Sequence, residues 1–112
     1  MNEQEIAKEL ELHKKWLNDK EGGKRADFSY KDLQEANLQG ADLRGANLRG
    51  ADLDFSCLPL WCGSFDIKVS DDFVYQLLYH VCKLKSDVVL PKKIKDLANK
   101  ANIRTKHNLP EV

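Results

Sequence analysis

The stretch from Ala26 to Phe55 repeats every five residues and reads Ala-Asp-Phe-Ser-Tyr, Lys-Asp-Leu-Gln-Glu, Ala-Asn-Leu-Gln-Gly, Ala-Asp-Leu-Arg-Gly, Ala-Asn-Leu-Arg-Gly, Ala-Asp-Leu-Asp-Phe. A looser pentad, Ser-Cys-Leu-Pro-Leu, continues it to Leu60. The middle residue of each pentad is large and apolar, and these residues are Phe28, Leu33, Leu38, Leu43, Leu48, Leu53 and Leu58. A stable fold has to bury them together, because they hold most of the segment's apolar surface.

A period of five fits neither regular secondary structure. In an α-helix, residues five apart differ by about 140° around the axis, so the leucines would spiral over the whole surface. In a flat strand, a shift of five moves a side chain to the opposite face each time. The leucines share one side only if the chain turns a corner in every pentad. The period therefore predicts a coil with its leucines inside.

The other pentad positions agree with one corner per repeat. The first position is mostly alanine, which is small enough to share a narrow interior with leucine. The second position is Asp or Asn in every pentad from Asp27 to Asp52, and these residues hydrogen-bond their own backbone in turns. The fifth position is glycine at residues 40, 45 and 50, where the backbone has to change direction.

The consensus Ala-Asp/Asn-Leu-X-X resembles that of the pentapeptide-repeat family. The resemblance implies a four-sided right-handed β-helix with about four repeats per coil. We therefore expect a mainly β solenoid with α-helical caps. The seven pentads make fewer than two coils, and a repeat array this short needs its ends covered by flanking segments.

The flanks predict helices. Residues 3–20 read as an amphipathic helix with Ile6, Leu10, His13 and Leu17 on one face, ended by Gly22-Gly23. After a short strand at 65–69, residues 71–85 predict a helix with an inward stripe of Phe73, Leu77, Val81 and Leu84. Pro91 begins a shorter helix, and a polar tail follows from Thr105. We expect a single domain, 1–112, with an N-terminal helix cap at 1–23, a β-helix at 24–60 and a C-terminal strand and helical cap with tail at 61–112.

The overall charge argues against direct nucleic-acid binding. Lys and Arg number 18, Asp and Glu also number 18, and the formal net charge is zero. No apolar run approaches the roughly 18 residues of a membrane span, and the N-terminus does not resemble a signal peptide. Three cysteines suggest reduced thiols and a cytoplasmic location.

The cysteines and histidines are the candidate metal ligands. Cys57, Cys62, His80 and Cys82 have the right chemistry for zinc, but Cys57 and Cys62 are a full repeat apart and His80 and Cys82 are about 200° apart around a helix. We expect Cys57 and Cys62 to be partly buried structural residues. The alternative is a zinc-stabilised module that uses Cys57, Cys62 and His80. A cysteine nucleophile with His80 or His13 as its base lacks any orienting motif, so we predict no enzyme and no cofactor.

Two sets of side chains are candidates for an interaction surface. The outward pentad positions carry Asp32, Asp42 and Asp52, with Arg44 and Arg49 offsetting part of their charge. If four repeats close a coil, Asp32 and Asp52 stack on one side. Tyr75 and Tyr79 lie one helical turn apart, opposite the predicted inward stripe, and would form an exposed aromatic pair at a homodimer interface. The alternative is that the tail from Thr105 to Val112 covers the pair.

The flanks of the repeats are also similar to those of short pentapeptide proteins of bacteria, prophages and phages. The similar residues are His13, Trp16-Leu17 and Gly22-Gly23 before the repeats, and Asp54 to Ser64 after them. Some family members are acidic solenoids that resemble duplex DNA and inhibit DNA gyrase. The resemblance implies a non-catalytic, macromolecule-binding protein with a protein partner. In its sharpest form it implies a phage- or mobile-element-encoded inhibitor of a host nucleic-acid-processing enzyme, either a CRISPR nuclease or DNA gyrase.

Overall fold

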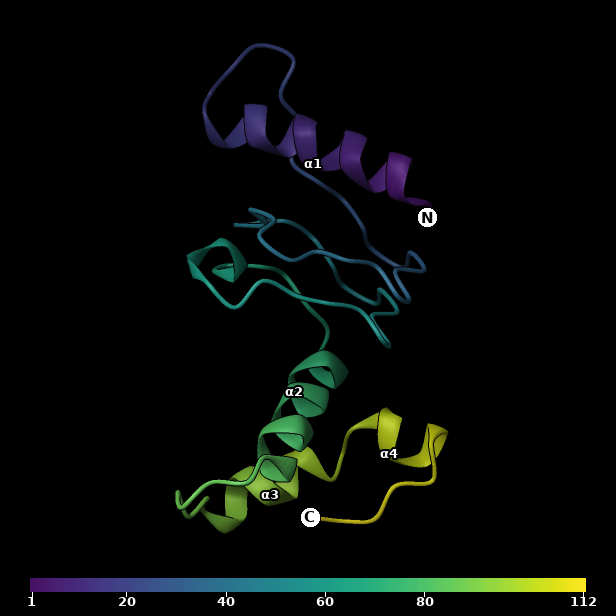
Figure 1. The fold of residues 1–112 in the computed structure, drawn as a ribbon, viewed down its shortest axis with the longest axis vertical. Helices are drawn as coiled ribbons and strands as arrows, with labels where there is room; N and C mark the ends of the chain where they lie inside the picture. The colour runs from purple at the N-terminus through teal and green to yellow at the C-terminus, as the bar shows by residue number, and fades with distance from the viewer. The chain divides into compact units, whose positions relative to one another are not determined.

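Helices are the only regular elements of the computed structural model, which describes residues 1–112 (Figure 1). They are α1 (Glu3–Leu17), the 3-10 helix η1 (Cys62–Ser64), α2 (Asp71–Lys83), α3 (Lys92–Ala98) and α4 (Asn102–Lys106). The chain divides into two compact units, Met1–Val69 and Ser70–Val112. The sequence instead predicts one domain, in which the C-terminal cap begins after residue 60. None of the helices has the length and apolar character needed to span a bilayer.

The repeat segment winds back on itself every twenty residues. Parallel bridges join Asp27 to Asn47, Asp32 to Asp52 and Asn37 to Cys57, so four pentads make one turn of the winding. The predicted inward positions are confirmed, because the five side chains from the first to the fifth pentad are at most 1% exposed: Phe28, Leu33, Leu38, Leu43 and Leu48. Leu53 is also buried, whereas Leu58 is only partly covered.

The prediction of a mainly β solenoid is wrong. The chain contains no β-strand and no sheet, and its backbone pairing is limited to isolated bridges. The physical reason lies in the pentad itself. Phe28 N–H donates to Asn47 O, and the chain already turns at the next two residues, Ser29 and Tyr30. A turn in each pentad ends the pairing after one bridge, so no continuous ladder forms.

The predicted turn chemistry is confirmed. In each of the six pentads from Asp27 to Asp52, the side-chain oxygen of the second residue accepts a hydrogen bond from the backbone N–H two residues later. The fifth residue then has a positive φ, which is +74° at Gly40. Tyr30, Glu35 and Phe55 take the same left-handed conformation without being glycine, at 58°, 62° and 60°.

The winding also extends beyond the repeats. Leu43 N–H donates to Gly63 O and Leu48 N–H donates to Lys68 O, so residues 61–69 form a further part of the winding. Asn47 pairs with Lys68 as well as with Asp27, which places three layers of chain on that side. The predicted strand at 65–69 is therefore wrong, because only Lys68 makes a bridge there.

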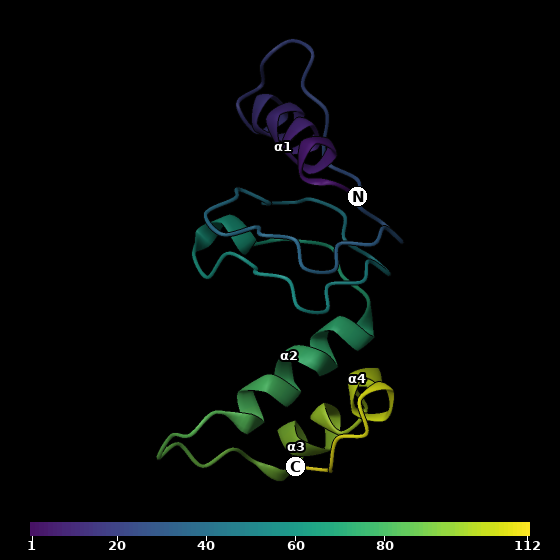
Figure 2. The ribbon, with the colours of Figure 1, turned by 45° about the vertical axis from the view of Figure 1, so that its right-hand side comes forward.

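Helix α1 begins at a capping box and lies across one end of the winding (Figures 1 and 2). The Asn2 side chain accepts a hydrogen bond from Glu5 N–H, and the Glu5 carboxylate accepts one from Asn2 N–H. The N-terminal ammonium donates to Asp32 O at 2.8 Å, which fixes the start of the helix to the repeats. The helix prediction for residues 3–20 is confirmed as far as Leu17.

The second unit is a small helical cluster. Helix α2 packs against α3 and α4 around Tyr79, Ala98 and Ala101. Helix α2 begins after Ser70 as predicted, but its predicted inward stripe is wrong, because Leu77 and Val81 are exposed and Tyr79 is buried. The polar tail predicted from Thr105 is wrong too: α4 runs to Lys106, and Leu109 and Val112 pack against the cluster.

Candidate interaction surface

The side of the winding beneath α1 is organised by a buried histidine. His13 is fully buried; its Nδ1 accepts the Ala26 N–H at 3.0 Å, and its Nε2 lies 3.0 Å from Arg44 O. The neutral Nε2–H tautomer satisfies both contacts, because it places the one ring proton opposite the carbonyl. Burial lowers the pKa of His13, the contact with the Arg44 carbonyl opposes that shift, and Trp16 stacks on the imidazole at 5.4 Å. His13 is thus a structural residue.

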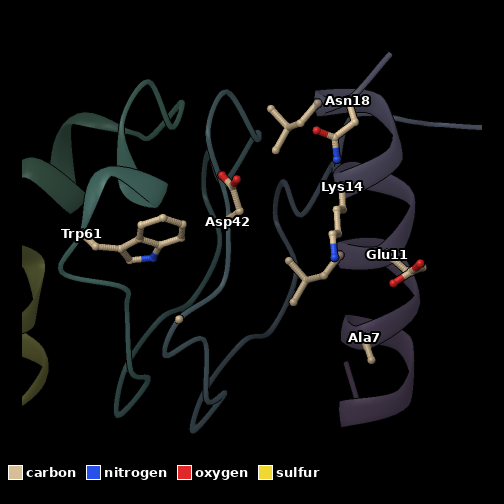
Figure 3. Close-up of a pocket in the computed structure, with 9 residues that line it drawn as sticks. Ala7, Glu11, Lys14, Asn18, Asp42 and Trp61 are labelled. Carbon is tan, nitrogen blue, oxygen red and sulfur yellow. The ribbon is translucent and has the colours of Figure 1, made fainter. Parts of the chain in front are cut away.

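A groove of about 530 Å³ lies between α1 and the winding (Figure 3). Leu10 and Leu17 of α1 and Trp61 supply its apolar lining, and Lys14, Asp42 and Asn18 are among its polar groups. Trp61 is fixed in place because its indole N–H donates to Ala41 O at 3.1 Å. The groove combines an apolar wall with charges of both signs.

The predicted acidic row lies on the outside of the winding, and its carboxylates have internal partners. Asp32 and Asp52 are bridged neighbours in successive turns, as four repeats per coil requires, and Gln34 donates to the Asp52 carboxylate at 2.8 Å. Asp42 forms a bidentate pair with Arg44 at 2.9 and 2.7 Å, and this guanidinium holds the pKa of Asp42 below its usual range. Two of the three carboxylates are thereby tied to neighbouring side chains, which weakens the case for phosphate mimicry.

Exposed apolar side chains surround the last turn of the winding. Phe55, Leu60 and Phe65 are spaced five residues apart, and they are 75%, 102% and 60% exposed. Trp61, next to Leu60, is half exposed. We call Phe55, Leu60, Trp61 and Phe65 the apolar rim. The sequence contains a signal for it, because the five-residue spacing that places glycine at residues 40, 45 and 50 places large apolar residues at 55, 60 and 65.

The predicted tyrosine pair is not an exposed surface. Tyr79 is 4% exposed and its hydroxyl donates to Pro110 O at 2.7 Å, while Tyr75 packs against the same cluster under Lys100. The alternative that the tail covers this pair is the arrangement observed. The interface prediction is therefore wrong for Tyr79, since tertiary packing turned the opposite face of α2 outward.

The structure does not gather the candidate metal ligands. No group of three or more His, Cys, Asp or Glu side chains is placed to hold a metal ion. All three cysteines are free. Cys57 and Cys62 are exposed, so their predicted burial is wrong. Cys57 lies at the Asp/Asn position of its repeat and bridges to Asn37, whereas Cys62 begins η1. The Nδ1 atom of His80 lies 2.8 Å from Gln76 O within α2.

Comparison with known proteins supports the repeat assignment. A family model described as pentapeptide repeats matches residues 24–59 with eight copies. No curated protein and no solved structure matches the chain. The matched residues are those whose central leucines are buried and whose Asp and Asn side chains close the turns. Residues 24–59 of the chain are therefore a pentapeptide-repeat segment.

Proposed function

We propose that this chain is a non-catalytic protein-binding module that contacts its partner through the apolar rim. The observation that supports the proposal is the exposure of Phe55, Leu60 and Phe65 in the last turn of the winding. Aromatic residues are enriched in protein interfaces, and they contribute most where a partner removes them from water. The backbone of this turn is hydrogen-bonded to the previous one, because Leu38 N–H donates to Cys57 O and Leu43 N–H donates to Gly63 O, so little ordering is needed on binding.

The partner we propose is a host nucleic-acid-processing enzyme, either DNA gyrase or a CRISPR nuclease, and the protein acts as its inhibitor. Contact through the apolar rim is favoured over phosphate mimicry, because Asp42 is neutralised by Arg44 and Asp52 is bonded by Gln34. A rim contact needs no long row of charges. The proposed inhibition is therefore insensitive to moderate salt, whereas charge mimicry weakens steeply as salt rises.

The test uses gyrase supercoiling and CRISPR nuclease cleavage with the purified full chain. We expect inhibition of one of these reactions at micromolar protein. The variant Phe55→Asn with Leu60→Ser should lose it by tenfold or more, because both side chains are exposed and Asn tolerates the positive φ at residue 55. Val89→Ser is the matched control, since Val89 is 90% exposed and lies outside the rim.

Two outcomes contradict the proposal. Full activity of both enzymes in the presence of the protein overturns inhibition. Equal inhibition by the rim variant and the parent chain overturns the rim as the contact surface. A binding measurement between each enzyme and the immobilised chain, made with the same variants, separates loss of contact from loss of inhibition.

A further inference from the structure

Helix α2 carries a second apolar face that its own unit leaves uncovered. Val74, Leu77 and Val81 lie on this face, and Leu84 follows directly after the helix. Their exposed fractions are 44%, 46%, 42% and 70%. The spacing of three, four and three residues places the four side chains within about 80° of one another around the helix. We call these residues the α2 stripe.

The stripe faces away from the core of the second unit. The residues that pack into that core are Tyr75, Leu78, Tyr79 and Cys82, on the other side of α2. Helices α3 and α4 and the chain end lie on that side as well (Figure 2). The stripe consists of two valine–leucine pairs, Val74 with Leu77 and Val81 with Leu84, and the two pairs begin seven residues apart. Apolar residues repeated in this way are typical of a helix that packs against another helix.

We propose that the α2 stripe is the seam of a homodimer in which the α2 helices of two copies pack antiparallel. We infer that a second copy of the chain covers the α2 stripe, because the charges at the two ends of α2 are complementary in an antiparallel pair. Asp71 and Asp72 lie in its first turn, and His80 and Lys83 lie in its last turn. An antiparallel pair places the acidic end of each helix beside the basic end of the other and opposes the two helix dipoles. A parallel pair would place like charges together.

The contact area that α2 can supply is small, and this predicts a weak dimer. Helix α2 has 13 residues and is therefore about 20 Å long. Such a face covers less than the roughly 800 Å² per partner of a standard interface. We expect a dissociation constant in the micromolar range. The dimer does not depend on the rim or on its proposed partner, since the stripe belongs to the other unit of the chain.

Sedimentation velocity of the full chain over a concentration series tests the proposal. The expected result is a reversible monomer–dimer equilibrium, with the dissociation constant raised tenfold or more by Leu77→Asp. The circular dichroism spectrum should be retained, because Leu77 is outside the unit's core. Val81→Ser gives a milder second disruption if Leu77→Asp loses structure. Asn108→Asp is the control, since it adds the same charge at an exposed position outside the stripe.

The orientation has its own test. Asp71→Lys and Lys83→Glu should each weaken the dimer, and the double variant should restore it, because only an antiparallel pair brings the two ends together. A 12.8 kDa monomer at every concentration, or dimerisation of Leu77→Asp equal to that of the parent chain, overturns the seam. Failure of the double variant to restore the dimer overturns the antiparallel arrangement.

Discussion

His13 shows how one side chain connects α1 to the repeats. It bonds the backbone of Ala26 through one ring nitrogen and that of Arg44 through the other. Removing the ring leaves a buried N–H and a carbonyl without partners, and each such loss costs about 1–3 kcal/mol. Its place among Ile6, Leu10 and Leu17 on the predicted helix face indicated burial. Its two partners come from separate pentads, so the sequence did not identify them.

The same histidine makes folding dependent on pH. Burial lowers the pKa of His13 in the folded state below the value of about 6.5 found in unfolded chains. The unfolded state then binds more protons, so the stabilisation is complete above about pH 6.5 and is lost as the pH falls below that value. We expect the urea midpoint to fall between about pH 7.5 and pH 5. A variant with His13→Asn should be less stable and lose most of this pH dependence, whereas one with His80→Asn should keep it.

The left-handed fifth position of the pentad is occupied by glycine in some repeats and by a residue with a side chain in others. Gly40 and Glu35 occupy the same pentad position, with φ of +74° and 62°. The left-handed conformation costs a residue with a Cβ about 1–2 kcal/mol, and glycine avoids this cost. Glu35 is exposed, and a Cβ at Gly40 would meet open space, so backbone conformation is the main difference between the two positions.

The two positions therefore predict substitutions of opposite sign. Gly40→Ala should destabilise the protein by about 1 kcal/mol, and Glu35→Gly should stabilise it by up to about 1 kcal/mol. Chemical denaturation measures both. Equal effects of the same sign would contradict a turn that depends on the left-handed conformation. Gly50→Ala is a harsher comparison, since its Cβ would come within 2.5 Å of the Tyr30 ring.

Helix α2 explains why its inward face was assigned wrongly. One side carries Val74, Leu77 and Val81, and the other carries Tyr75, Leu78 and Tyr79, so both sides are apolar enough to be buried. Periodicity identifies a helix but does not choose between two apolar faces. The choice follows from Pro110, Leu109 and Val112, which return from the chain end to cover the tyrosines.

The neutral net charge is unevenly distributed between the two units of the chain. Residues 1–69 contain ten basic and thirteen acidic side chains, and residues 70–112 contain eight and five. The first unit is therefore acidic and the second is basic. The net charge of zero therefore describes neither unit alone. The difference in charge between the units depends on the boundary after Val69, which the structure shows.

The two units also predict separate local stabilities. Tyr79→Phe removes the hydrogen bond to Pro110 O and should cost about 1 kcal/mol in the second unit. Hydrogen exchange should then be faster in α2, α3 and α4, while the protection of residues 26–53 stays unchanged. A uniform loss of protection in both units would show that they unfold as one.

Features that depend on residues close together in the chain could be predicted from the amino-acid sequence. The inward leucines, the Asp and Asn turns, the glycine corners and the start of α1 all follow from spacing and local hydrogen bonds. Tertiary structure alone decided which face of α2 is buried, how far the winding extends past Leu60 and where Cys57 and Cys62 lie. It also showed that a turn in each pentad leaves isolated bridges and no strands. These features depend on contacts between residues twenty or more positions apart, and no local pattern specifies such contacts.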